Sequence, residues 1–140
     1  MNQPTFNQIV GVFLIRTLLG LIFCLQGFAK VFNWGIDNIY KNAFQAYEES
    51  LPKILTVFTA YYTSYVELIA GFLLIIGFFR NYALYALGSV LLIVSFGHGF
   101  QEGIWDLNHV MFRAILLIAL LLLPEQWDKW QIQKFIKKSE

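Results

Sequence analysis

The sequence predicts an all-α integral membrane protein, a bundle of four transmembrane helices with a short amphipathic interfacial helix after the first. Two observations lead to this fold class. Hydrophobic residues make up 58% of the 140 residues and charged residues only 14%, whereas soluble domains contain roughly 45–50% apolar and 25% charged residues. The apolar residues also gather in four long runs, at 9–29, 54–79, 82–100 and 107–123.

Each run is close to the length that a membrane span requires. A helix needs ~20 residues to cross ~30 Å of hydrocarbon, and within the four runs the formal charges are Arg16, Glu67 and Arg113. The segment before the first run has no Lys or Arg, and no small-residue cleavage site follows it. We therefore expect the first run to be a membrane span and not a signal peptide.

The connections between the runs differ in length. Residues 30–53 carry apolar side chains at helical spacing, which predicts the amphipathic helix on the membrane surface. Residues 125–140 place Trp127 and Trp130 near four lysines, which predicts a basic amphipathic cytoplasmic tail on an anionic leaflet. No repeat or linker interrupts the chain, so we expect residues 1–140 to form a single domain.

The distribution of Lys and Arg predicts the orientation in the plasma (inner) membrane. Four spans place both termini on one side. That side carries Arg80 and four tail lysines, whereas the other side carries three lysines, with Arg113 just inside its span. The excess of Lys and Arg on the side of the termini predicts that both termini are cytoplasmic.

Composition also excludes several classes of function. The net charge is +1, with 10 Lys and Arg against 9 Asp and Glu, so no basic face for nucleic acid is expected. The single cysteine, Cys24, excludes a disulfide framework and a multi-cysteine metal site within the chain. The two histidines are a weak metal signal, and we assign no metal site and no intrinsic cofactor.

Arg16 and Glu67 form the predicted buried polar pair. Charges inside spans usually face the bundle interior and pair with one another. We interpret the two as a structural ion pair, and the alternative is a proton-handling Glu67 that serves quinone chemistry. Gly20, Gly27 and Gly71 share the faces of the two charges, and small residues there favour close helix packing.

Several motifs together resemble the DoxX family of small four-helix membrane proteins, over residues 12–123. They are Arg16-x3-Gly20, Gly27-x2-Lys30, Glu67-x3-Gly71 and Gly77-x2-Arg80. The chain departs from the family after the fourth run, where Leu123-Pro124-Glu125-Gln126-Trp127 replaces a Gly-rich stretch leading to Ser and Asp. Related DoxD-type subunits belong to a thiosulfate:quinone oxidoreductase, and some DoxX proteins are linked to thiol-redox complexes. The resemblance thus implies a redox-associated membrane subunit, without a catalytic residue set.

A second polar cluster is predicted at the outward end. Apolar pockets with a few convergent polar groups bind small molecules, and Trp34 and Trp105 would add aromatic surface. The cluster is therefore a candidate site for a quinone or lipid headgroup, and the alternative is a set of structural charge pairs. Its members are Lys30, His98, Glu102, Asp106, His109 and Arg113.

Two classes of function remain open. The first is an accessory subunit of a quinone- or thiol-linked membrane redox complex, surrounded by membrane lipids, with a redox protein or a second copy as partner and quinone as the candidate cofactor. The second is a small transporter or lipid-binding protein that uses the Arg16/Glu67 pair and the outward cluster. Inverted repeats would favour a transporter, and none is present in the sequence.

Overall fold

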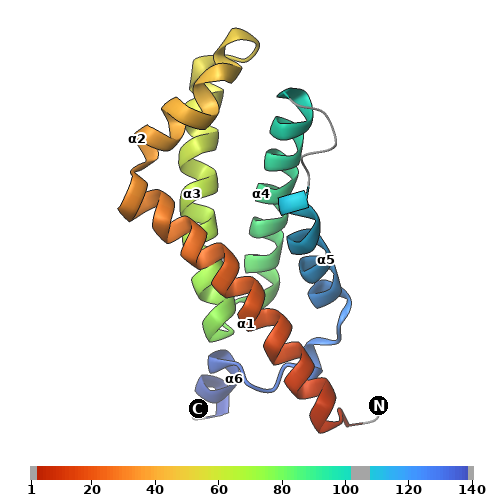
Figure 1. Ribbon diagram of the computed structural model, residues 1–140. Coiled ribbons are helices and arrows are strands. Elements are labelled where there is room, and N and C mark those ends of the chain that lie inside the picture. Colours follow the sequence, from red (N-terminus) through yellow and green to blue (C-terminus); the bar gives the residue numbers. More distant parts are fainter. Residues whose placement is uncertain (1–2, 102–107, 139–140) are drawn as a thin grey trace.

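The computed structural model describes residues 3–101 and 108–138, which form a helical bundle with both chain ends at one end (Figure 1). We call this the terminal end and the other the opposite end. No strand occurs in the described ranges. The long helices are α1 (Phe6–Phe28), α3 (Lys53–Ile76), α4 (Arg80–Gln101) and α5 (Asn108–Leu122).

Helix α1 together with the turns that follow it is longer than the predicted span at both ends. Thr5 and Gln8 form a capping box, in which each side chain accepts the backbone N–H of the other residue at 3.4 and 2.8 Å. This cap starts the helix before the apolar run. At the other end the helix continues as the π-helical turns η1 (Ala29–Trp34), until Gly35 breaks it with a φ of 77°.

The turn between α3 and α4 lies three residues earlier than the sequence predicts. Gly77 adopts the left-handed conformation, with a φ of 69°, and ends α3 at Ile76. The N–H groups of Gly77 and Phe78 donate to the carbonyls of Leu74 and Leu73, at 3.1 and 2.9 Å. This is the pattern of a glycine-terminated helix. Arg80, predicted as part of the turn, is instead the first residue of α4.

Helices α1 and α3 approach each other through glycines. A Cβ atom on Gly27 would lie 2.7 Å from the Cα of Leu68, and one on Gly71 would lie 2.9 Å from the Cα of Cys24. Both distances are shorter than non-bonded carbon atoms tolerate. The two helices therefore run antiparallel with their backbones in contact, and the glycines determine which residues of α1 and α3 lie opposite each other.

Residues 36–49 are helical, as predicted. They comprise α2 (Ile36–Ile39), the π-helical η2 (Tyr40–Phe44) and the 3₁₀ segment η3 (Gln45–Glu49). The segment packs along the first turns of α3 (Figure 1), and the Tyr61 hydroxyl donates to the Asp37 carboxylate at 2.9 Å. That it lies on a membrane surface remains a prediction.

The first part of the tail packs into the terminal end of the bundle, and that the tail rests on a leaflet remains a prediction. The tail contains η5 (Glu125–Trp127) and α6 (Ile132–Lys138), and it lies beneath the long helices at the terminal end (Figure 1). Asp128 and Gln131 are fully buried, and the Trp130 ring meets the edge of the Phe13 ring at 5.1 Å. A buried carboxylate requires a partner inside the bundle, so the tail docks there.

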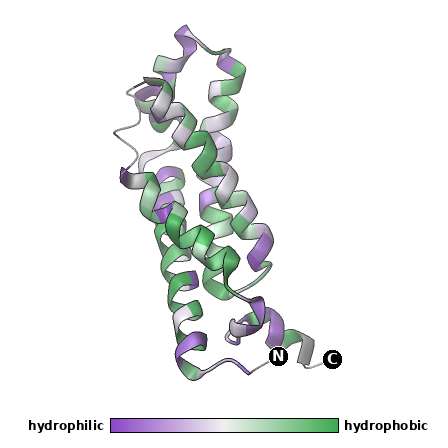
Figure 2. Cartoon of the chain, turned by 90° about the vertical axis from the view of Figure 1, so that its right-hand side faces the viewer, coloured by the Kyte–Doolittle hydropathy of each residue, from purple (hydrophilic) through white to green (hydrophobic). Residues whose placement is uncertain are grey.

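The described helices have the length and composition of membrane spans. Three qualify fully: Phe6–Trp34, Lys53–Ile76 and Arg80–Phe100. The fourth is the shorter apolar helix Val110–Leu122, and the predicted start of its span, Leu107, lies outside the described residues. Hydrophobic residues dominate the middle of the bundle (Figure 2). The predicted fold class, an all-α membrane bundle, is confirmed.

The glycine contacts yield a stability prediction. We expect Gly27→Ala to destabilise the protein by ~1–3 kcal/mol, because the new methyl group overlaps the α3 backbone. Thermal unfolding in mild detergent, followed by circular dichroism, measures the effect.

Gly11→Ala is the matched control on the same helix. No atom lies within 4 Å of a Cβ at Gly11, so this change should be neutral or slightly stabilising. Equal melting temperatures for the two variants would show that the close α1–α3 contact does not form.

Candidate functional site

The bundle contains two buried charge clusters, one at each end. The terminal cluster consists of Arg16 of α1, Arg80 of α4 and Asp128 of the tail. The Nε atom of Arg16 lies 3.1 Å from Asp128 Oδ2, and the Nε atom of Arg80 lies 3.9 Å from the same oxygen. All three side chains are at most 2% exposed. One carboxylate therefore serves two guanidinium groups.

Carbonyl groups at the ends of two helices carry partial negative charge and also bind these arginines. Arg16 donates to the carbonyls of Leu74 and Ile75 in the last turn of α3 and, at 2.7 Å, to that of Trp130 in the tail. Arg80 donates to the carbonyls of Leu120 and Leu123 at the end of α5. The last carbonyls of a helix lack internal partners and carry partial negative charge. Each arginine thus caps a helix and binds Asp128.

Two neighbouring residues complete the terminal cluster. Gly77 leaves space for it, since a Cβ there would lie 2.8 Å from Arg16 Nη1 and 2.9 Å from the Cα of Gln131. Lys134 donates to the carbonyls of Asp128 and Glu125, at 2.6 and 3.1 Å. Burial lowers the pKa of Lys134, against the opposing attraction of Asp128 and Glu125. The tail is therefore held by several polar contacts.

The structure does not bring Arg16 and Glu67 together, although both are buried. Glu67 pairs with Lys30, whose Nζ lies 2.7 Å from Glu67 Oε2. The helix alignment is the reason. Gly27 lies against Leu68, so Glu67 lies beside the C-terminal end of α1. Arg16 lies eleven residues before Gly27, about 16 Å away along the helix.

The opposite cluster contains Lys30, Glu67 and Arg113. The Arg113 guanidinium lies over the ring of Phe23, 5.7 Å from its centroid, and is near enough to attract the Glu67 carboxylate. The hydroxyls of Thr63 and Ser64, one turn from Glu67, both donate to the carbonyl of Ala60. Two cations from different helices thus face one carboxylate.

The structure describes only some of the other predicted members of the outward cluster. His98 lies on an exposed part of the last turns of α4. Glu102 and Asp106 lie outside the described residues, and the side chain of His109 is not described. Of the predicted site, the structure therefore brings together Lys30 and Arg113. Within the described ranges, no group of three His, Cys, Asp or Glu residues could hold a metal ion.

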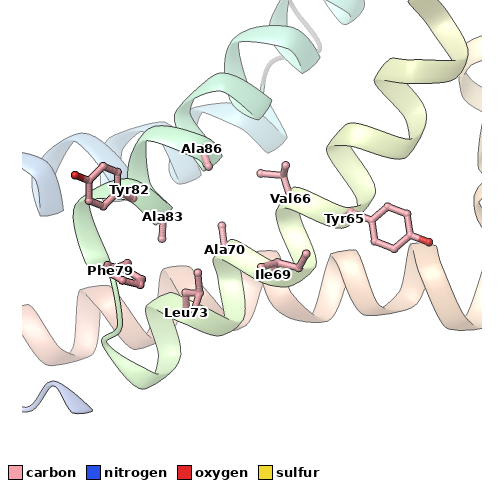
Figure 3. A pocket seen from close by; sticks show the side chains of 9 residues that line it. All are labelled: Tyr65, Val66, Ile69, Ala70, Leu73, Phe79, Tyr82, Ala83 and Ala86. Atoms are coloured by element: carbon pink, nitrogen blue, oxygen red, sulfur yellow. The ribbon is translucent and has the colours of Figure 1, made fainter. Parts of the chain in front are cut away.

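Two apolar grooves flank α4. The first groove lies between α3 and α4, has a volume of about 590 Å³ and is lined by nine residues, including Tyr65, Ala70, Phe79 and Tyr82 (Figure 3). The second groove lies between α4 and α5, has a volume of about 460 Å³ and includes Leu92. Neither groove was predicted from the sequence, because both depend on how the helices are spaced.

Sequence reasoning also missed Asp128. A signal was present, because two arginines at or within apolar runs need an acidic partner, and the tail carries Glu125 and Asp128 directly after the fourth run. The interpretation of the tail as a surface segment concealed this partner.

The terminal cluster yields a coupling prediction. Asp128→Asn should destabilise the protein by about 3–5 kcal/mol, because it leaves two buried guanidinium groups without a counter-charge. The double variant Arg16→Gln/Asp128→Asn should cost less than the sum of the single changes. Melting in mild detergent measures all three variants.

The pair Arg16→Gln/Glu67→Gln is the matched control. Arg16 and Glu67 belong to different clusters, so the destabilisation of the double variant should equal the sum of the two single variants. Coupling between Arg16 and Glu67, with additivity between Arg16 and Asp128, would contradict the observed pairing.

Comparison with known proteins assigns the family. The DoxX family model matches residues 11–99, more than half of the chain. The matched residues include most of α1, all of α3, most of α4, both partners of the Lys30–Glu67 ion pair and the two arginines of the terminal cluster. No curated protein and no solved structure matches significantly. The chain belongs to the DoxX family.

Proposed function

We propose that this DoxX-family chain is an accessory subunit of a membrane redox complex and that it binds quinone in the first groove. The groove itself is the observation that carries the proposal. Its volume of about 590 Å³ falls within the ~300–1,000 Å³ range of small-molecule sites. The lining is apolar apart from the hydroxyls of Tyr65 and Tyr82, which suits an isoprenoid chain with a polar ring.

The two tyrosines lie at opposite ends of the groove, and their hydroxyls point away from its middle (Figure 3). Tyr65 and Tyr82 are 45% and 73% exposed, and neither hydroxyl has a hydrogen-bond acceptor in the described part of the chain. A phenol in hydrocarbon is costly without an acceptor, and a quinone carbonyl at either end of the groove would supply one. The rings of Phe79 and Tyr82, 6.2 Å apart, offer aromatic surface at the terminal end of the groove.

The buried charges favour an accessory role over a self-sufficient enzyme. Glu67 is held by Lys30, and Asp128 is held by two arginines. Such contacts stabilise the bundle and do not poise either carboxylate for proton transfer. We infer that a partner protein supplies the redox centre, as the family resemblance implies.

Lipid binding is the second candidate function, and the opposite cluster favours it. Lys30 and Arg113 place two positive charges near one carboxylate. Within this cluster of three side chains one positive charge is left over, and such a charge attracts an anionic headgroup.

Quinone content tests the proposal. Ala86→Trp extends into the first groove from a partly buried position and should reduce the quinone that co-purifies from mild detergent by at least about tenfold, a loss equivalent to ~1.4 kcal/mol. Quinones and phospholipids are extracted and quantified by mass spectrometry, and co-purifying redox proteins are identified in the same sample.

Leu92→Trp, in the second groove, is the matched control and should retain quinone. Wild-type protein without quinone would contradict the proposed ligand. Arg113→Gln lies outside the first groove and should retain quinone, and a loss of phospholipid in this variant would support the second candidate.

We also propose the plasma-membrane orientation with both termini cytoplasmic. In a Cys24→Ser background, Asn42→Cys at the opposite end should react with an impermeant thiol reagent in intact cells. Lys129→Cys in the tail should react only after lysis. Both positions are exposed, so the reverse labelling pattern would contradict the orientation.

A further inference from the structure

The first groove ends at a strained residue. Among the described residues other than glycine, Phe79 alone has a positive φ, 48°. The left-handed region is unfavourable for a bulky side chain, because Cβ approaches the backbone. Residues kept in such conformations concentrate at functional sites and persist only where surrounding contacts hold them.

A tail residue holds Phe79. The backbone N–H of Phe79 donates to the side-chain carbonyl of Gln133 in α6, at 3.1 Å. Helix α6 follows the docked segment, where Asp128 binds Arg16 and Arg80. Lys134, next to Gln133, ties α6 back to the carbonyls of Glu125 and Asp128. The terminal cluster therefore determines where the Gln133 carbonyl lies.

Phe79 also shapes the groove. The Phe79 side chain lines its terminal end together with Tyr82 (Figure 3), and its ring also meets that of Phe78 at 4.3 Å. A change in the backbone of Phe79 would move this ring and thereby alter the groove. A single hydrogen bond thus connects the docked tail to the groove.

We propose that Gln133 is a positioning residue, which holds Phe79 in its left-handed conformation so that docking of the tail sets the shape of the groove. The role in ligand binding rests on the proposed quinone site. The effect on Phe79 does not depend on any ligand.

Paired variants of Gln133 separate the hydrogen bond from other roles of the side chain. Gln133→Leu removes the acceptor at similar size, whereas Gln133→Glu keeps an oxygen that can accept the Phe79 N–H. Lys129→Ala, an exposed tail residue, is the matched control. Circular dichroism confirms equal helical content before the variants are compared.

The first measurement needs no ligand. With 4-fluorophenylalanine at position 79 of the full-length protein, the ¹⁹F resonance should shift or broaden in Gln133→Leu. In Gln133→Glu and Lys129→Ala the resonance should keep its wild-type position and width. An unchanged resonance in Gln133→Leu would overturn the proposal.

The second measurement is the affinity for decylubiquinone in detergent. Gln133→Leu should weaken binding roughly three- to tenfold, the loss that corresponds to one net hydrogen bond, and Gln133→Glu should restore it. A shifted resonance with unchanged affinity would overturn the link between tail and groove. Wild-type protein that does not bind decylubiquinone would overturn the quinone function, and the ¹⁹F resonance alone would then decide whether Gln133 positions Phe79.

Discussion

The architecture depends on one buried carboxylate, that of Asp128. Arg16 and Arg80 come from different membrane helices, and each reaches the carbonyls at the end of a further helix. Two guanidinium groups so deeply buried would repel each other without a counter-charge, since Coulomb energies are large away from water. Asp128 supplies that charge from the tail. The interaction therefore joins α1, α4, the ends of α3 and α5, and the C-terminal segment at one place.

Helix α1 links this terminal cluster to the opposite cluster. Arg16 and Lys30 are fourteen residues apart, about 21 Å along a helix, and each pairs with a carboxylate from a different segment of the chain. Between them, Gly20 and Gly27 bring the α1 backbone against α3. Close packing in the middle and ion pairs at both ends hold α1 across the bundle. The carboxylates are engaged in these ion pairs, and we therefore place the proposed quinone site in the groove between α3 and α4.

The first groove and the terminal cluster are neighbours, and this adjacency gives the tail a second role. Arg80 follows Phe79 directly in the chain, so the residue that binds Asp128 adjoins the residue that closes the groove. Gln133 completes the connection through the Phe79 N–H. Stabilising the fold and shaping the groove are thus tasks of one short segment, although its sequence suggested only a basic surface helix.

Sequence patterns were sufficient to predict the helical membrane class, the approximate spans, the burial of Arg16 and Glu67 and the family, because hydropathy, helical periodicity and short motifs are local properties. It did not determine the charge partners. The turn was misplaced by three residues because the left-handed Gly77 ends α3 early. The Arg16–Glu67 contact was predicted, yet Gly27 against Leu68 aligns Glu67 with Lys30 instead. Asp128 was missed because the tail was interpreted as a surface segment, and the grooves were missed because they depend on how the helices are spaced. Which charges meet depends on helix alignment and on tail docking, and contacts between residues distant in sequence decide both.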